Sequence, residues 1–167
     1  MNLEFVPETS PILMQECKEF DFDNPPFDPK EFAQALHDKM IKSDGLGLSA
    51  NQVGIPYRVF VMRTGNKPFA VFNPKVVDMS DKEISMKEGC LSYPLLYLSV
   101  KRPDSIRIRF QNEEGETRTE KFIGMTARIA QHEFDHMVGK VYTEQASAFE
   151  TQRAMRKRMI LKRKVKR

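Results

Sequence analysis

The sequence Gln-His-Glu-Phe-Asp-His at residues 131–136 places two of the chain's three histidines four residues apart. On an α-helix, residues i and i+4 lie on one face, so the imidazoles of His132 and His136 can reach a single metal ion. Glu133 follows the first histidine, where its carboxylate can take a proton from metal-bound water. Such spacing also arises by chance on charged surface helices, so the motif alone leaves both interpretations open.

A catalytic metal site of this kind needs a third protein ligand and one open position. Zinc proteases with a similar motif take that ligand from further along the chain. Here the only downstream acids are Glu144 and Glu150, and both come soon after Gly139, where we expect the helix to end. The protease interpretation is therefore disfavoured.

An upstream segment, EGCLSYP (88–94), offers Cys90 as the missing ligand. It lies close to the strand-like segment YLSV, and a cysteine at a strand's edge could reach across to the histidine helix. Most free cysteines are small buried hydrophobic residues. That alternative stays open for Cys90 and is preferred for Cys17, while His37 is expected at or near the surface of its helix.

The segment GLGLSANQVG (45–54) is the third candidate. Gly45 and Gly47 permit close backbone approach or a positive φ. No Gly-Lys-Ser/Thr follows, so a phosphate-binding loop is not indicated. A plain helix-to-strand turn is the alternative, and Gln52 contributes a side-chain amide donor just after an apolar stretch.

Helical patterns lie on both sides of these motifs. Apolar residues recur at helical spacing over residues 29–45, and Gly45 ends the pattern. A short helix is predicted over residues 12–22. Two more are predicted over residues 125–139, which carry the two histidines, and over residues 143–159.

Short segments rich in Val, Ile and Phe predict strands between the helices. They are residues 57–63, 69–79 and 105–111. The polar run NEEGET (112–117) predicts a hairpin turn. Because strands and helices do not alternate, the order indicates an α+β fold.

The composition, with 40% hydrophobic and 30% charged residues, is typical of a soluble globular protein. At 167 residues the chain fits one domain with its own core. No apolar run approaches the length of a transmembrane helix, and the N-terminal residues lack signal-peptide features. Two cysteines do not make a disulfide framework, which favours a reducing, intracellular compartment.

Charge is distributed unevenly along the chain. Residues 1–152 carry 18 Lys/Arg against 23 Asp/Glu, whereas residues 153–167 carry nine Lys/Arg and no acid. We therefore expect a catalytic domain over residues 1–150 and a basic, helical C-terminal tail over residues 151–167. Such tails contact polyanions or are merely solvated.

Taken together, GLGLSANQ, EGCLS and QHEFDH resemble, in order and approximate separation, the three motifs of the peptide deformylase family. The resemblance covers roughly residues 5–160. Each motif alone is weak or moderate evidence, but three in order are highly specific. The resemblance implies antiparallel or mixed β-sheets around a central metal-binding helix, with a C-terminal helix.

In that family, the residues matching Cys90, His132 and His136 hold one divalent metal ion. The resemblance implies Fe²⁺ as the native ion, with Zn²⁺, Ni²⁺ or Co²⁺ able to substitute, and a thiolate with two imidazoles suits these ions. It implies that Glu133 is the general base. Together with the metal, the Gln52 amide and the Leu91 backbone N–H would hold the oxyanion that forms when hydroxide attacks the formyl carbon of N-formylmethionine.

The resemblance also implies an apolar pocket for the methionine side chain and an extended peptide lying as an added strand between GLG and EGC. The implied substrate-binding residues are Leu46, Gly47, Met86, Gly89, Met125, Arg128 and Ile129. Arg128 stands where apolar residues are common in the family, and its guanidinium is expected to reach toward solvent.

Ser49 and Tyr97 also depart from the family pattern. Ser49 stands where Ala is usual, and because it is small we expect packing to survive. Tyr97 is expected in a loop after EGCLSYP, where some bacterial members have an arginine near the peptide. Contacts beyond the first substrate side chain depend on that difference.

Bacterial-type members have a basic C-terminal helix that contacts the ribosome, so the tail here implies docking to ribosomal RNA phosphates. Along this helix Ala148, Gln152, Met155 and Met159 form a weakly apolar stripe. Few large apolar residues make a membrane role less favoured. We expect a cytoplasmic monomer from a bacterium or phage-infected cell, or an organelle. A zinc endopeptidase and a catalytically silent RNA-binding protein are the alternatives.

Overall fold

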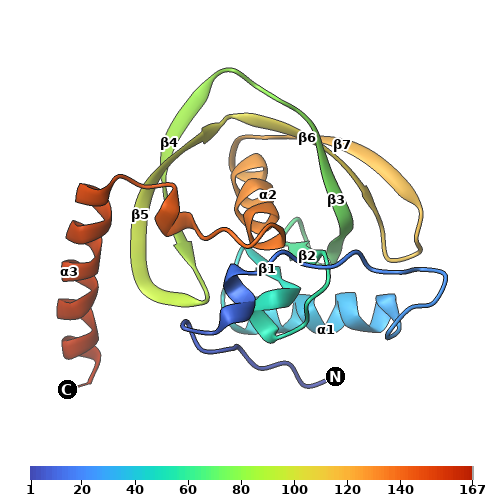
Figure 1. Cartoon of the computed structure of the whole chain (residues 1–167), viewed down its shortest axis with the longest axis horizontal. Helices are drawn as coiled ribbons and strands as arrows, with labels where there is room; N and C mark the ends of the chain where they lie inside the picture. The colour runs from blue at the N-terminus through green and yellow to red at the C-terminus, as the bar shows by residue number, and fades with distance from the viewer. Residues whose placement is uncertain (167) are drawn as a thin grey trace.

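The computed structural model describes residues 1–166 and contains a five-stranded antiparallel sheet with the strand order β1-β2-β3-β6-β7 (Figure 1). The strands are β1 (Gly47–Ser49), β2 (Val59–Met62), β3 (Phe69–Met79), β6 (Ser105–Gln111) and β7 (Thr117–Ile123). Strands β3 and β6 begin and end where the sequence predicted, and the predicted turn separates β6 from β7. The antiparallel sheet and its separate helices confirm the α+β prediction.

A second sheet pairs β4 (Glu83–Cys90) with β5 (Tyr93–Pro103) in antiparallel register. Cys90 is the last residue of β4, and the ladder shifts register between Glu88 and Cys90. Tyr97 lies within β5, so the expectation of a loop was wrong. It lies between Leu98, which pairs with Glu88, and Tyr93, which pairs with Cys90, where the ladder shifts register.

The helix α2 (Gly124–Met137) lies between the two sheets (Figure 1). Its small residues Ala127 and Ala130 pack with Met137 in a core formed with β2, β3, β6 and β7. The chain leaves the helix through Gly139, whose φ is 71°. A side chain there would meet the backbone of Met14 at 2.7 Å, so the close approach requires glycine.

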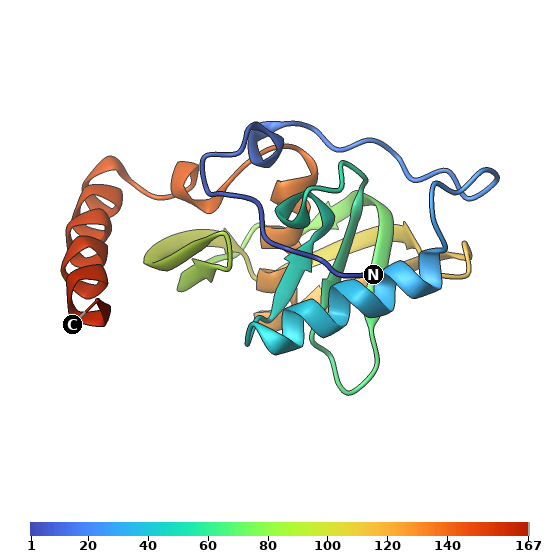
Figure 2. The same cartoon turned by 90° about the horizontal axis from the view of Figure 1, so that it is seen from below.

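The helix α1 (Pro29–Lys42) lies along the first sheet, as Figure 2 shows from below. Asp28 caps it by accepting a hydrogen bond from the backbone N–H of Glu31. Its apolar face, predicted from the sequence, packs on β1 and β2. His37 is buried on this helix, so the expectation of a surface position was wrong.

The N-terminal segment does not form the helix predicted over residues 12–22. Only a 3-10 turn, Pro11–Met14, forms. Beyond it the chain is extended because it pairs with distant backbone: the Cys17 N–H donates to the Met137 carbonyl, and Lys18 bridges to Tyr57. Local helical spacing is therefore overruled by tertiary pairing.

The helix α3 (Ala148–Val165) stands beside β5 at one end of the molecule (Figures 1 and 2). It begins five residues later than predicted, because Ser147 accepts the capping hydrogen bond from the Glu150 N–H. Ala154 and Arg158 are its buried residues, while the predicted apolar stripe is exposed. Along the described part of the chain, α3 included, we find no helix with the length and apolar character needed to span a bilayer.

Candidate active site

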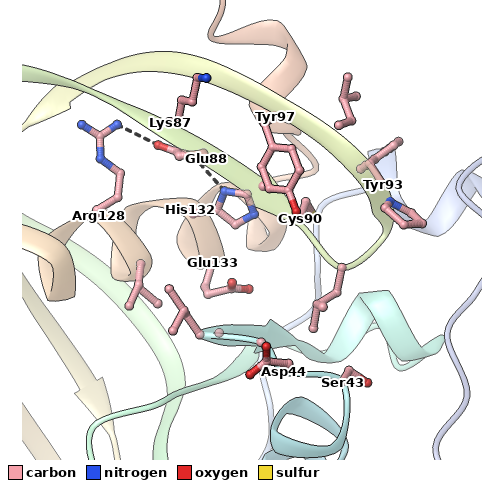
Figure 3. Close-up of a pocket in the computed structure, with 18 of the residues that line it drawn as sticks. Ser43, Asp44, Lys87, Glu88, Cys90, Tyr93, Tyr97, Arg128, His132 and Glu133 are labelled. Carbon is pink, nitrogen blue, oxygen red and sulfur yellow. Dashed lines mark hydrogen bonds and ion pairs between the residues drawn. The ribbon is translucent and has the colours of Figure 1, made fainter. Parts of the chain in front are cut away.

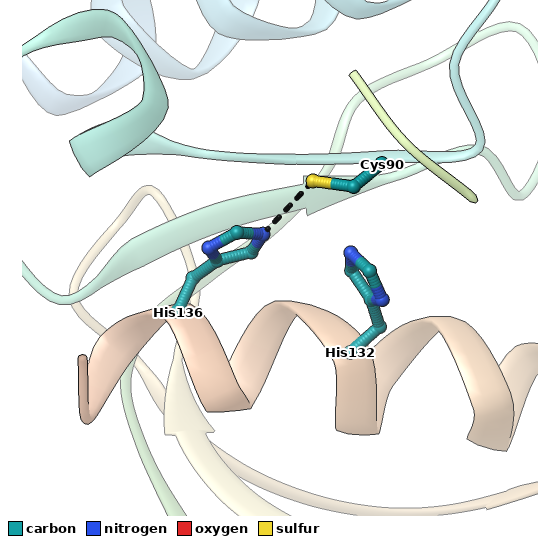
Figure 4. A group of neighbouring side chains, drawn as sticks. All are labelled: Cys90, His132 and His136. Atoms are coloured by element: carbon teal, nitrogen blue, oxygen red, sulfur yellow. Dashed lines mark hydrogen bonds between the residues drawn. The ribbon is translucent and has the colours of Figure 1, made fainter. Parts of the chain in front are cut away.

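Three side chains from two elements converge between the sheets. Cys90 comes from the end of β4, and His132 and His136 from adjacent turns of α2 (Figure 4). One ligand atom from each lies within 4.8 Å of the others, and Cys90 Sγ is 3.5 Å from His136 Nε2. Two ligands of one tetrahedral ion with usual bond lengths lie roughly 3.5 Å apart. The donor set therefore fits a divalent metal ion.

Glu88 supports this cluster, and the sequence reasoning missed it. Its carboxylate is buried, and Oε1 lies 2.9 Å from His132 Nδ1. Glu88 fixes the ring because a hydrogen bond at Nδ1 directs Nε2 toward the ligand cluster. The available signal was the period of two along β4, which puts Glu88 and Cys90 on the same face.

Two arginines hold the Glu88 carboxylate from other elements. Arg102 on β5 donates from Nε and from a terminal nitrogen at 2.6 and 2.9 Å, and Arg128 on α2 donates at 2.7 Å. Arg102 also pairs with Asp135 at 2.7 Å. The two arginines balance the two carboxylates, so the buried cluster is electrically neutral when His132 is neutral.

The pKa values of this cluster follow from burial and these contacts. Burial alone would raise the pKa of Glu88, but hydrogen bonds from His132 and Arg102 outweigh it and hold the pKa far below the usual value. Burial opposes charge on His132, but hydrogen bonds to Cys90 and Glu88 raise its pKa to about 10. Burial and the nearby positive charge of His132 lower the pKa of His136 well below its usual value. Metal binding needs both rings neutral, so it is coupled to proton release from His132.

Glu133 lies next to the cluster on the face of α2 that meets β1. Its carboxylate is buried, and Oε2 accepts a hydrogen bond from Ser49 Oγ at 2.6 Å. Burial raises its pKa, while the charge of His132 and the Ser49 hydrogen bond act in the opposite direction. A carboxylate with a raised pKa, placed beside a group of candidate metal ligands, is suited to proton transfer near neutral pH.

The side-chain amide of Gln52 faces the same cluster. Its Nε2 donates to Ser92 Oγ at 2.9 Å and lies 3.4 Å from Cys90 Sγ. Its Oε1 accepts from the Ser49 N–H at 2.9 Å. This fixed orientation puts an N–H donor beside the ligand thiol, where an oxyanion could be stabilised.

A cavity of about 500 Å³ opens onto Glu133 and His132 (Figure 3). Most residues predicted for the substrate line it: Leu46, Gly47, Gly89, Met125, Arg128 and Ile129. Leu91, predicted to donate its backbone N–H, lines it as well. Met86 is not among the lining residues, because it lies further along β4, opposite Val100. Sequence analysis did not assign Lys87 and the β5 residues Tyr93, Pro94, Leu95 and Leu96 to this cavity, although they line it.

The prediction that the Arg128 guanidinium reaches solvent was wrong. Arg128 is buried and donates to Glu88 Oε2, the Val100 carbonyl and the Ile84 carbonyl, each at 2.7 Å. An arginine can remain buried only when its donors are paired, and β4 and β5 supply the acceptors. The side chain therefore ties α2 to the second sheet and closes one wall of the cavity.

Comparisons with known proteins agree with this geometry. The family model described as polypeptide deformylase matches residues 3–152. The chain is 38% identical over 138 residues to the peptide deformylase of Thermotoga maritima, which covers 83% of this chain and 84% of the relative. It is also similar to a crystal structure of peptide deformylase from Thermotoga maritima, with a TM-score of 0.82, 33% identity, and coverage of 88% and 99% of the two chains.

A second solved structure, of a peptide deformylase from Synechococcus elongatus in complex with actinonin, has a TM-score of 0.86 and 27% identity. It covers 93% of this chain and 86% of that chain. The family match over residues 3–152 spans all three motifs and both sheets.

Proposed function

The chain belongs to the polypeptide deformylase family, metal-dependent hydrolases that remove the formyl group from the N-terminus of new polypeptides, and we propose that Cys90, His132 and His136 hold its metal ion. The convergence of their three ligand atoms within 4.8 Å is the observation that carries this assignment. Glu133 beside them supplies a proton-transfer group that is not itself part of the ligand set.

A divalent ion at this site would act as a Lewis acid on the formyl carbonyl and lower the pKa of water. Glu133 takes the proton from the attacking water as the new C–O bond forms. It then delivers that proton to the peptide nitrogen as the C–N bond breaks, which gives formate and a free amine. The Gln52 side-chain amide and the Leu91 backbone N–H stabilise the negative charge on the formyl oxygen.

The substrate lies in the 500 Å³ cavity, with its backbone between the β1 segment and β4. Gly47 and Gly89 line the cavity on its two sides, and an unbranched methionine side chain fits beside the apolar wall. That wall is formed by Leu46, Met125 and Ile129. Arg128 limits the depth of the cavity at this wall, because hydrogen bonds to β4 and β5 hold its guanidinium in place.

Fe²⁺ is the native ion in this proposal, with Zn²⁺, Ni²⁺ or Co²⁺ able to replace it. The support is chemical: one thiolate and two imidazoles form a mixed sulfur and nitrogen donor set that suits all four ions. An iron-loaded sample exposed to air should lose activity by oxidation at Cys90, whereas a nickel-loaded sample should keep it. Equal stability of the two samples would contradict a ferrous thiolate site.

The proposed domain organisation is a catalytic domain over residues 1–150 and a basic tail over residues 151–167. The tail would dock a monomeric, cytoplasmic enzyme on ribosomal RNA phosphates, where formylated chains emerge. Support comes from α3, on which six Lys/Arg side chains are exposed, namely Arg153, Arg156, Lys157, Lys162, Arg163 and Lys164, and Lys166 directly after the helix is exposed as well.

Formate release from formyl-Met-Ala-Ser tests the activity directly. The metal-loaded chain should release one formate per peptide, leave the internal peptide bonds intact, and fail to release acetate from acetyl-Met-Ala-Ser. Cleavage between Met and Ala would instead indicate an endopeptidase. That outcome is disfavoured because the candidate metal ligands found among the described residues include neither Glu144 nor Glu150.

A further inference from the structure

Ser49 occupies a position where a hydroxyl group is unexpected. It is the last residue of β1 and immediately precedes the 3-10 helix Ala50–Val53, and it is 0% exposed. A hydroxyl group without solvent needs a partner within the protein. The sequence suggested only that a small side chain fits here, which does not explain why the side chain is polar.

The hydroxyl's single hydrogen has two acceptors within reach, both on Glu133. Ser49 Oγ lies 2.6 Å from the carboxylate Oε2 and 3.3 Å from the backbone carbonyl. The shorter distance is that of a charge-assisted O–H···O⁻ hydrogen bond. Ser49 therefore donates its stronger hydrogen bond to the Glu133 carboxylate, the group to which we assign proton transfer.

The second carboxylate oxygen is confined from the same strand. A side chain at Gly47 would place its Cβ 2.5 Å from Glu133 Oε1, so the glycine lets this oxygen sit against the strand backbone. Residues 47 and 49 are two apart and face the same side of β1. The strand thus holds one oxygen by a hydrogen bond and the other by close packing.

The backbone of Ser49 acts on the second catalytic group. Its N–H donates to Gln52 Oε1 at 2.9 Å, which turns Gln52 Nε2 toward Cys90 and Ser92. One residue therefore contacts both groups that surround the ligand cluster without belonging to it.

We propose that Ser49 is a positioning residue for deformylation, whose hydroxyl fixes the Glu133 carboxylate in the orientation needed for proton transfer. The inference rests on the proposed role of Glu133 as the base. Proton transfer requires a heavy-atom separation of about 2.6–3.2 Å, and a carboxylate free to rotate spends less time in that geometry. Holding it in advance raises the rate of the chemical step without changing substrate affinity.

The test compares Ser49→Ala and Ser49→Cys with the wild-type chain, all loaded with nickel. In Ser49→Ala we expect kcat for formyl-Met-Ala-Ser to fall between about tenfold and 150-fold, the range of one hydrogen bond to a charged group. KM and metal content should stay within twofold. Ser49→Cys keeps a weak donor of similar size, so its kcat should lie between that of the wild type and that of Ser49→Ala. Wild-type kcat in Ser49→Ala, or a change in KM alone, would overturn the proposal.

A double-mutant cycle separates positioning from a general structural effect. In a Glu133→Gln background the hydroxyl has no base to orient, so adding Ser49→Ala should leave the residual rate unchanged. An equal loss in both backgrounds would show that Ser49 acts elsewhere and refute the proposal. If Ser49→Ala unfolds, the Ser49→Cys arm of the cycle gives the same discrimination. Absence of formate release by the wild-type chain would instead remove the proposed function itself.

Discussion

The helices α2 and α3 both carry many ionisable residues, but the two helices differ in what surrounds those residues. On α2, His132, Glu133 and His136 are buried between two sheets. On α3, the basic side chains other than Arg158 face solvent, and Ala154 and Arg158 are the buried residues. Burial fixes geometry and shifts pKa values, so α2 can support chemistry. Exposed charges are screened and mobile, so α3 is suited to long-range attraction.

One buried arginine links the two regions. Arg158 donates from Nε to the Pro94 carbonyl at 2.9 Å and pairs with Glu8. Pro94 and Leu95 line the substrate cavity, and Leu95 has a φ of 65°. A non-glycine residue in this conformation is held there by its surroundings. The contact at Pro94 therefore connects the position of α3 with the cavity rim.

The largest expected effect is on kcat, and it should differ between an acid on α2 and an acid on α3. Glu133→Ala should lower kcat by about 10²–10⁴, because a positioned general base is lost, while the bound metal remains at one ion per chain. Glu150→Ala on α3 is the matched control and should retain wild-type kcat. Loss of metal together with activity in Glu133→Ala would make Glu133 a ligand and contradict its assignment as the base.

A second large effect concerns Glu88, whose carboxylate is hydrogen-bonded to His132. Glu88→Gln should weaken metal affinity by about 10- to 100-fold, as measured by chelator competition, because the His132 ring loses its charged partner. It should also cost about 3 kcal/mol or more of unfolding free energy, since Arg102 and Arg128 lose their buried counter-charge.

The pH dependence of that stability has a definite sign. The pKa of folded Glu88 is depressed, so its stabilising contribution is present above the unfolded value near about 4.3 and is lost as the pH falls through the folded pKa. The difference in unfolding free energy between wild type and Glu88→Gln should therefore shrink as pH falls below 4. A constant difference down to acidic pH would show that the carboxylate charge is not the cause.

Arg158→Ala should have a moderate effect. We expect a loss of about 1–3 kcal/mol in unfolding free energy, because the ion pair with the part-exposed Glu8 and the hydrogen bond to the Pro94 carbonyl disappear together. The rate of formyl-peptide cleavage should fall a few-fold, because Pro94 at the cavity rim loses its contact with Arg158. Arg156→Ala, an exposed neighbour on α3, is the control and should match wild type in both measurements. Equal behaviour of the two variants would mean that α3 is not coupled to the cavity.

The smallest effect on chemistry is expected from reversing exposed charges on α3. Changing Arg156, Lys157 and Lys162 to Glu should leave formyl-Met-Ala-Ser cleavage within twofold of wild type, because none lines the cavity. Co-sedimentation with ribosomes should weaken, most visibly at low salt, since each phosphate contact releases a counterion. Unchanged ribosome binding across a salt series would leave α3 as a solvated helix.

The sequence predicted those parts of the fold whose signals are local. Periodic apolar residues located α1, α2, β3 and β6, and the four-residue spacing of His132 and His136 fixed their common helix face. It did not predict the buried network of Glu88, Arg102 and Arg128, because these residues come from three elements and only tertiary packing brings them together. The same reason explains why Arg128 was expected at the surface and residues 12–22 as a helix.

The metal content of two cysteine variants tests the central claim most directly. The described residues include two free cysteines, both shielded to some degree, so Cys17→Ala is a matched control for Cys90→Ala. After metal loading and desalting, we predict about one ion per chain in wild type and in Cys17→Ala, and less than about a tenth of that in Cys90→Ala. Retention of a full equivalent of metal by Cys90→Ala would contradict the ligand set on which the catalytic assignment depends.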